Sequence, residues 1–309
     1  MGIISKQYIK NLVGRYDKQV GIPYYSYTDF KGLKQELFVF TNSKGIEIHY
    51  FYYYRDNFRK DKTILFCPGI GPGHTAYLAE INQLTKRGYR VLTLDYTGCD
   101  SSKGKYMGSL NMPTLDVNEL LDHLKLDNEV VLVGHSLGGY TSLNSIKLRK
   151  EITKAVILSP FLSIETLLRS FIKSSFVVKR ILKYEQKTVG DYYGIDNLSY
   201  LKETKDKLLF IQSDDDPTVP YDISLKVVEG IDNSCIKTIR MSNRKHNPNY
   251  TEKAANYLFK VLAKYNKAIA DKKIKNDEDR INFFKGISIE DLTEQDEEVF
   301  NQISAFIDQ

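Results

Sequence analysis

The chain has 309 residues, of which 42% are hydrophobic and 27% are charged, and its formal net charge is +5. This length and composition are typical of a protein that folds around a core, and they exclude a disordered or fibrous chain. No run approaches the roughly 18 apolar residues of a membrane-spanning helix, and the N-terminus lacks the apolar stretch of a signal peptide. We therefore expect a cytoplasmic protein without a transmembrane segment.

The charges are unevenly distributed along the chain. Residues 277–309 contain 10 acidic and 2 basic residues, so residues 1–276 carry a net charge of +13. A basic surface can attract nucleic acid or anionic lipid, but these lysines are scattered among acids and no nucleic-acid-binding motif accompanies them. The pattern favours a solvated surface and no nucleic-acid partner. The three cysteines, Cys67, Cys99 and Cys235, lack metal-ligand spacing and are expected to be buried free thiols.

From about residue 38 to residue 265, short β-branched or aromatic runs alternate with amphipathic stretches. Strands are predicted at 37–41, 46–54, 63–67, 90–95, 130–134, 155–159, 208–212 and 235–241, and helices at 75–87, 114–126, 137–150, 221–231 and 251–267. The first two strands flank a short Asn-Ser-Lys-Gly turn, which predicts an antiparallel hairpin. The other strands should be parallel, because strand and helix alternate as in βα units.

Two segments depart from this alternation. Residues 160–205 are too long for an ordinary connection between a strand and a helix, and their apolar residues predict a small helical cap. Residues 268–309 follow the last helix of the core. They end in a segment whose capping-box-like start at 293–296 precedes three apolar residues on one face, so a final docked helix is expected. We therefore divide the chain into an N-terminal extension (1–36), a core (37–267) with a cap insertion (160–205), and an acidic C-terminal extension (268–309).

The strongest motif lies where the strand at 130–134 meets a predicted helix. Residues 134–138 read G-H-S-L-G, and the glycines permit a sharp turn that lifts the Ser136 hydroxyl above the edge of the sheet. Ser136 then stands at a helix N-terminus, where the helix dipole and unpaired amides favour a developing oxyanion. The motif indicates a nucleophilic serine.

This segment resembles the nucleophile elbow of the α/β-hydrolase superfamily. Over about residues 45–265, the chain is similar to the branch that contains monoacylglycerol lipases, lysophospholipase-like esterases and serine aminopeptidases. The resemblance implies an α/β fold with a mostly parallel, doubly wound sheet of about eight strands and a small helical cap. A serine at the elbow argues against the dehalogenases and epoxide hydrolases of the same fold.

The segment at 66–71, F-C-P-G-I-G, is similar to the family's H-G-x-G loop. The resemblance implies that the backbone amide of Ile70 donates to the oxyanion hole and that the amide of Leu137 is the second donor. Pro68 stands where the family usually has a histidine, but backbone donors can tolerate this change. Residues 95–102 resemble a structural turn of the family, with Asp100 where a glycine is common, and we assign no catalytic role to them.

Three acids, Asp214, Asp215 and Asp216, follow the strand at 208–212. An aspartate at this place can accept the Nδ1–H of a catalytic histidine and so set its tautomer. Chemistry alone leaves the choice among the three open. In the family that the chain resembles, the acid directly precedes P-x-V-P, and this implies Asp216.

His246 is the only one of the five histidines that follows these acids, and it lies in a polar loop before the last core helix. Serine, acid and histidine therefore occur in the chain order of α/β hydrolases. This order predicts a serine hydrolase that forms an acyl-enzyme and needs no metal or organic cofactor. We expect a small-molecule carboxylic ester as substrate. Amidase, aminopeptidase or thioesterase activity, or a catalytically silent binding protein, are the alternatives.

The cap insertion at 160–205 leaves the predicted sheet near the carboxyl ends of strands, where ligands bind in doubly wound folds. We expect it to roof the pocket and to present Phe171, Phe176 and Ile181 to the substrate. The alternative is that these side chains only pack on the body. The basic residues of the insertion (Lys173, Lys179, Arg180 and Lys183) then form a solvated face, or one that contacts a membrane surface transiently.

Overall fold

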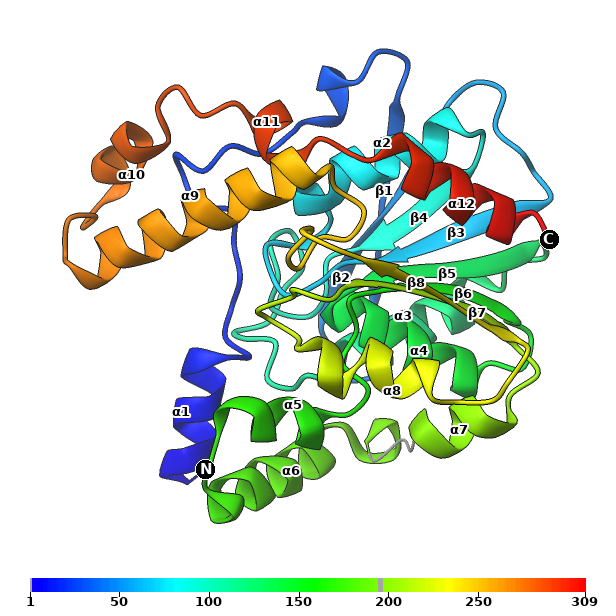
Figure 1. Ribbon diagram of the computed structural model, residues 1–309, viewed down its shortest axis with the longest axis horizontal. Helices are drawn as coiled ribbons and strands as arrows, with labels where there is room; N and C mark the ends of the chain where they lie inside the picture. Colours follow the sequence, from blue (N-terminus) through cyan, green and yellow to red (C-terminus); the bar gives the residue numbers. More distant parts are fainter. Residues whose placement is uncertain (1, 194–196) are drawn as a thin grey trace.

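The computed structural model describes residues 2–193 and 197–309. These residues form a twisted eight-stranded sheet with helices on both faces (Figure 1). The strands are β1 (Lys34–Thr41), β2 (Glu47–Tyr54), β3 (Lys62–Cys67), β4 (Arg90–Leu94), β5 (Glu129–His135), β6 (Lys154–Leu158), β7 (Lys207–Ser213) and β8 (Ile236–Met241). All eight predicted strands are present, so the predicted fold class is confirmed.

The order of strands across the sheet is β1-β2-β4-β3-β5-β6-β7-β8. β1 and β2 form the predicted antiparallel hairpin, β2 also runs antiparallel to β4, and all later pairs are parallel. The central strands are continuous apolar runs because helices cover both of their faces; every residue of β3, for example, is buried. The carboxyl ends of the parallel strands therefore meet at one edge of the sheet.

The helices form two layers and two outlying groups. They are α1 (Ile3–Asn11), α2 (Leu78–Lys86), α3 (Met112–Leu124), α4 (Leu137–Leu148), α5 (Ile164–Phe171), α6 (Ser175–Val189), α7 (Asn197–Glu203), α8 (Leu225–Glu229), α9 (Glu252–Ala270), α10 (Asp277–Phe284), α11 (Ile289–Thr293) and α12 (Glu297–Ile307). The apolar faces of α2 and α12 share one core with the sheet, whereas α3, α4 and α8 share the other. No helix among the described residues is long and apolar enough to cross a membrane.

The insertion at 160–205 is helical, as predicted, and contains α5, α6 and α7. The buried carboxylate of Glu185 on α6 fastens it to the rest of the chain. This carboxylate accepts hydrogen bonds from the hydroxyls of Tyr8 and Ser109, both at 2.5 Å, and from the amide of Leu110 at 3.0 Å. The insertion is thus packed against α1, with which α5 and α6 form a group below the sheet in Figure 1.

The C-terminal extension ends in the expected docked helix, although α12 begins after Asp296 rather than at Thr293. The Asp296 side chain accepts hydrogen bonds from the amides of Glu298 and Val299, which makes it the N-cap. Five apolar side chains of α12 are buried against the sheet and α2: Val299, Phe300, Ile303, Phe306 and Ile307.

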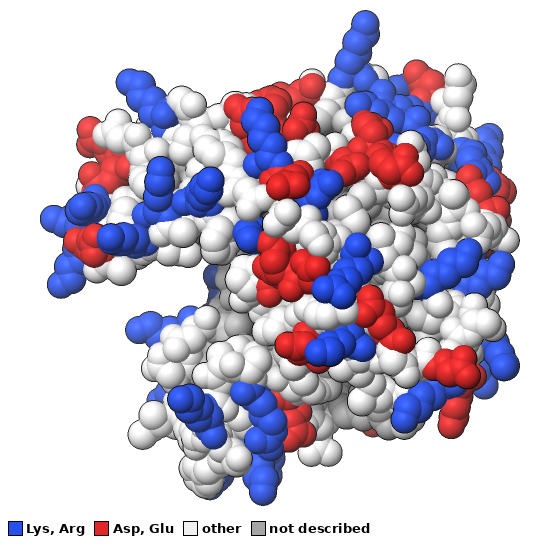
Figure 2. Space-filling view, in the orientation of Figure 1, with Lys and Arg blue, Asp and Glu red and all other residues white. Residues whose placement is uncertain are grey.

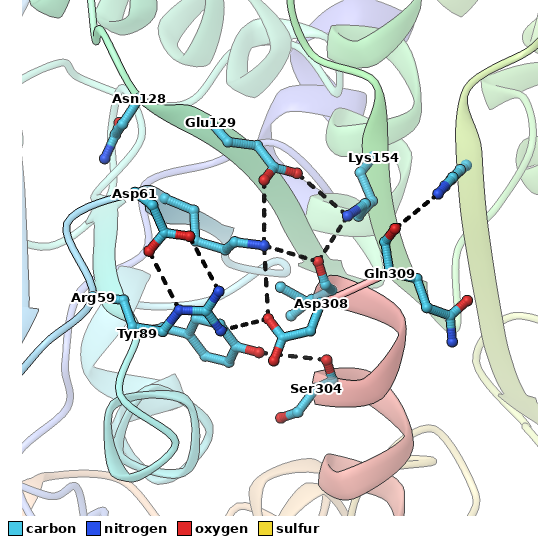
Figure 3. Close-up of polar contacts among 12 residues, drawn as sticks. Arg59, Asp61, Tyr89, Asn128, Glu129, Lys154, Ser304, Asp308 and Gln309 are labelled. Carbon is cyan, nitrogen blue, oxygen red and sulfur yellow. Dashed lines mark hydrogen bonds and ion pairs between the residues drawn. The ribbon is translucent and has the colours of Figure 1, made fainter.

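Charged side chains at the amino ends of the strands bind the end of α12 (Figure 3). The ammonium groups of Lys62 on β3 and Lys154 on β6 donate to the carbonyl of Ile307, at 3.1 and 2.7 Å. Both also pair with Glu129, which compensates the burial of their charges. Cations at this point complement the negative end of the helix dipole. The C-terminal end of α12 is therefore fixed at the edge of the sheet opposite the carboxyl ends of the parallel strands.

Candidate active site

The turn between β5 and α4 holds Ser136 in a conformation that its glycine neighbours make possible. Ser136 has φ +56° and ψ −118°, and its amide donates to the carbonyl of Leu158 on β6 at 2.8 Å. A Cβ atom on Gly138 would lie 1.8 Å from the Cys67 carbonyl oxygen, and one on Gly134 would lie 2.2 Å from the Gly138 carbonyl oxygen. Only glycine allows this packing, so the predicted sharp turn at the carboxyl edge of the sheet is present.

The structure brings His246 and Asp216 together from two loops. Asp216 follows β7, and His246 lies between β8 and α9. The Nδ1–H of His246 donates to Oδ2 of Asp216 at 2.8 Å, and the Asp216 side chain is fully buried. Its other oxygen, Oδ1, accepts from the amides of Thr218 and Val219 at 2.8 and 3.0 Å. The carboxylate is thus held in place, and the Nε2 atom of His246 is left as an acceptor.

The other two acids of this run have different partners. Asp214 pairs with Arg240 at 3.1 Å, and Asp215 pairs with Lys245 at 2.5 Å. Although partial burial opposes the effect, the hydrogen bond from Lys245 lowers the pKa of Asp215. The geometry therefore selects Asp216 as the partner of His246, in agreement with the family resemblance.

His135, to which the sequence motifs assign no role, connects the turn at Ser136 to the loop that carries His246. Its Nε2 lies 2.7 Å from the backbone carbonyl of His246, and its Nδ1 lies 2.9 Å from the hydroxyl of Tyr77. Because a carbonyl can only accept, Nε2 carries the proton and Nδ1 accepts from Tyr77. Burial, together with the nearby His246, lowers the pKa of His135 to about 3, so the ring is neutral. The only sequence signal was a histidine inside the G-x-S-x-G motif.

The two predicted oxyanion donors lie beside this turn. Leu137 is the first residue of α4, and amides in the first turn of a helix have no acceptor within the helix. The loop that carries Ile70 lies against the turn, since a Cβ atom on Gly69 would be 3.3 Å from the Cβ of Ser136. The carbonyl of Pro68, the residue that departs from the family pattern, accepts from the hydroxyl of Tyr96 at 3.1 Å.

Asp95 has the structural role expected for its segment. Its buried carboxylate accepts hydrogen bonds from the amide of His74 at 2.9 Å and from the amide of Ser101 at 3.2 Å, and it lies 2.7 Å from Nδ1 of His74. Asp100, at the position where a glycine is common, has a positive φ of 36°. These contacts hold the loops after β3 and β4 in place.

A cavity of about 430 Å³ opens beside His246. Ile70 and His135 also line it, whereas Ser136, Leu137 and Asp216 are not among the residues that line it. The remaining walls come mainly from residues 22–25, from residues 72–79, from α9, and from α10 and α11. The volume lies within the range of small-molecule sites, roughly 300–1,000 Å³.

The three cap residues that we expected in the substrate pocket do not line this cavity. Ile181 is buried against α1, and it borders a separate depression together with Phe171. Phe176 is 60% exposed, and the guanidinium of Arg180 covers its ring. The structure therefore places these three side chains away from this cavity, because the contacts of Glu185 hold the insertion against α1.

Known structures share this fold. An esterase of Pyrococcus furiosus is 18% identical, with a TM-score of 0.57 over 88% of this chain and 97% of its own. The α/β hydrolase domain-containing protein 10 from mouse is 17% identical, with a TM-score of 0.52 over 76% of this chain and 99% of its own. At these identities, the likeness concerns the fold.

Sequence comparisons identify the family. The salicylic acid-binding protein 2 of Nicotiana tabacum is 35% identical over 111 residues, which are 35% of this chain and 40% of that protein. The alignment thus spans less than half of the relative. The family model described as serine aminopeptidase, S33, matches residues 59–231, which is more than half of the chain. The protein therefore belongs to the S33 serine aminopeptidase family of hydrolases, within the α/β-hydrolase superfamily.

Proposed function

We propose that the protein hydrolyses carboxylic esters by acyl transfer to Ser136. The observation that carries this proposal is the 2.8 Å hydrogen bond from His246 to the buried Asp216, beside a turn that presents a serine at a helix N-terminus. A carboxylate in this position fixes the tautomer in which Nε2 can accept a proton, and it stabilises the imidazolium that follows.

In the proposed reaction, Nε2 of His246 takes the proton of the Ser136 hydroxyl while the oxygen attacks the ester carbonyl. The amides of Ile70 and Leu137 hold the resulting oxyanion. The tetrahedral intermediate collapses, and the leaving alcohol takes the proton from His246. A water molecule, activated by the same histidine, then releases the acid and regenerates Ser136.

The walls of the cavity favour an ester over a peptide with a free amino terminus. A free amino group is positively charged near neutral pH, and a carboxylate is its usual partner in a binding site. Among the described residues that line the cavity, none is an aspartate or a glutamate. An uncharged ester therefore fits these walls better than the substrate in the family's name.

Two measurements test the proposal. A fluorophosphonate probe should label the wild-type protein at Ser136, because only an activated serine reacts with it. Matched acyl substrates with an ester, a thioester or an aminoacyl-amide bond should then be hydrolysed fastest at the ester. Absence of labelling would indicate a catalytically silent member of the fold, and faster hydrolysis of the amide would indicate an aminopeptidase.

His135 offers a test of how the histidine loop is positioned. Replacing His135 by Phe keeps an aromatic ring, though a larger one, and removes the hydrogen bonds to the His246 carbonyl and to the Tyr77 hydroxyl. We expect kcat for the ester to fall about 100-fold, the scale for a displacement of about 1 Å between reacting groups. Tyr77→Phe is the comparison: it removes the hydrogen bonds of the Tyr77 hydroxyl to Nδ1 and to the Gly69 backbone but leaves the bond between Nε2 and the His246 carbonyl, so it should cost less. An unchanged kcat in the His135 variant would show that the loop needs no such support.

A further inference from the structure

We propose that the cavity beside His246 binds the apolar acyl chain of the substrate, and that α9 together with the C-terminal extension forms the wall that selects chain length. This inference rests on the ester hydrolysis proposed above. In this proposal, α9, α10 and α11 contact the substrate's acyl chain, and the cap insertion does not.

The cavity lies beside the proposed reacting centre and has apolar walls. On one side are His246 and Ile70, the residues next to the reacting atoms in the proposed mechanism. On the other side are apolar side chains of α9 and of the extension: Leu258, Phe259, Leu262, Phe284 and Leu292. In the proposed mechanism, the chain of an ester bound at Ser136 would enter this cavity past His246 and Ile70 and meet these side chains. Burying a hydrocarbon chain in such surroundings is favourable because it removes apolar surface from water.

The walls of the cavity contain few charged side chains. Of the described residues that line the cavity, only Lys245 is a lysine or an arginine. Its ammonium group pairs with Asp215 at 2.5 Å and lies 5.7 Å from the centre of the Phe259 ring. Because this cation already has partners, and because His135 is neutral, the walls present no free charge to a ligand. A hydrocarbon chain matches these walls, whereas a chain that ends in a charged group does not.

The wall made by α9, α10 and α11 is held together by contacts within the protein and needs no ligand to form. Phe284 of α10 and Leu292 of α11 are buried against Val261 and Tyr265 of α9 in a small core of their own. Two backbone hydrogen bonds join the extension to the histidine loop: Thr251 to Glu294 at 2.9 Å, and Asp296 to Asn249 at 2.8 Å. The extension is therefore held at a fixed place relative to His246, as a pocket that measures chain length requires.

The wall also lies outside the part of the chain that matches the family model, since that match ends at residue 231. In Figure 2, α9 and α10 form an arm that projects from the body, and a deep notch separates it from the lobe of α1 and α5. The arm thus consists of the last core helix and the extension that follows it, and the acyl site lies between this arm and the loops that carry His246 and Ile70.

The experiment compares two substitutions on α9. Leu262 and Ile269 are almost equally exposed, at 44% and 45%, but only Leu262 lines the cavity. Leu262→Trp should narrow the cavity and Ile269→Trp should not, and neither position is buried enough to endanger folding. For 4-nitrophenyl octanoate relative to 4-nitrophenyl acetate, we expect the kcat/KM ratio to fall about tenfold in the Leu262 variant. It should be unchanged in the Ile269 variant and in Phe176→Ala of the cap insertion.

An equal loss on both esters in the Leu262 variant would overturn the proposal, as would the same change in the Ile269 variant. A second measurement separates this proposal from that of ester hydrolysis. Octan-1-ol should bind to the Ser136→Ala protein in calorimetric titration, and Leu262→Trp in that background should weaken the binding about tenfold. If no ester is hydrolysed but this binding pattern is found, the apolar site stands and only the proposed reaction fails. Absence of octanol binding would refute the site.

Discussion

Replacing Ser136 by alanine is expected to abolish ester hydrolysis, with a fall in kcat on the order of 10⁴ to 10⁶. The reason is that the hydroxyl contributes the attacking oxygen and no other group near the turn can replace it in the proposed mechanism. Turnover of 4-nitrophenyl acetate by the purified variant, with active-site titration of the wild type, measures this directly.

The same variant should remain folded, since the backbone of Ser136 makes the contacts that hold the turn. Its amide donates to Leu158 at 2.8 Å, its carbonyl accepts from the amide of Tyr140 at 3.0 Å, and alanine keeps both bonds. Ser170→Ala on α5, where the hydroxyl bonds only to the carbonyl of Leu167, is a matched control that should keep full activity. Activity of the Ser136 variant within tenfold of wild type would rule out this serine as the nucleophile.

The sheet and the serine turn could be predicted because their determinants are local. A central parallel strand covered on both faces has to be an apolar run, and the β1–β2 hairpin was marked by two strand-like runs around a short turn, so all eight strands could be expected near their places. At the turn, Gly134 and Gly138 are required by contacts within a few residues, or with the neighbouring β3, so the motif itself describes the geometry. Chain order then placed Asp216 and His246 in adjacent loops.

The surroundings of the site could not be predicted in the same way, because they depend on pairings between distant segments. The position of the cap insertion is set by the contacts of Glu185. Nothing in the sequence indicates that the Glu185 carboxylate bonds to Tyr8, which is 177 residues away. The contact of His135 with the carbonyl of His246 spans 111 residues and involves a backbone atom, which no sequence pattern marks. The apolar residues of the extension were visible as a docking face, but the surface that they meet was not.

The acidic residues of the C-terminal extension form ion pairs with basic residues of the rest of the chain. Several acids of the extension pair with arginines of the basic body: Asp308 with Arg59 at 2.6 Å, Glu297 with Arg87 at 2.7 Å, and Asp296 with Arg244 at 2.9 Å. Partly exposed pairs of this kind contribute little stability individually. Together they help to orient the extension, because its acids meet arginines at three separate places on the rest of the chain.

The second large effect is expected for Asp216→Asn, which should lower kcat about 10⁴-fold, the scale for losing the acid that sets the histidine tautomer. The contacts of the carboxylate explain why asparagine is so unfavourable here. The amides of Thr218 and Val219 both donate to Oδ1, so the carbonyl oxygen of the asparagine has to take that place. Its NH₂ group then faces Nδ1 of His246. That nitrogen becomes an acceptor, the proton moves to Nε2, and the histidine can no longer take the proton of Ser136.

Asp214→Asn is the matched control, because Asp214 belongs to the same acidic run but pairs with Arg240 on the surface. It should keep kcat within about tenfold of wild type, since a partly exposed ion pair contributes little. Both variants should show the circular dichroism of the wild type, because the backbone donors around position 216 keep an oxygen acceptor. If Asp214→Asn proves the crippling change and Asp216→Asn stays active, then the hydrogen bond between Asp216 and His246 is not the one that catalysis uses.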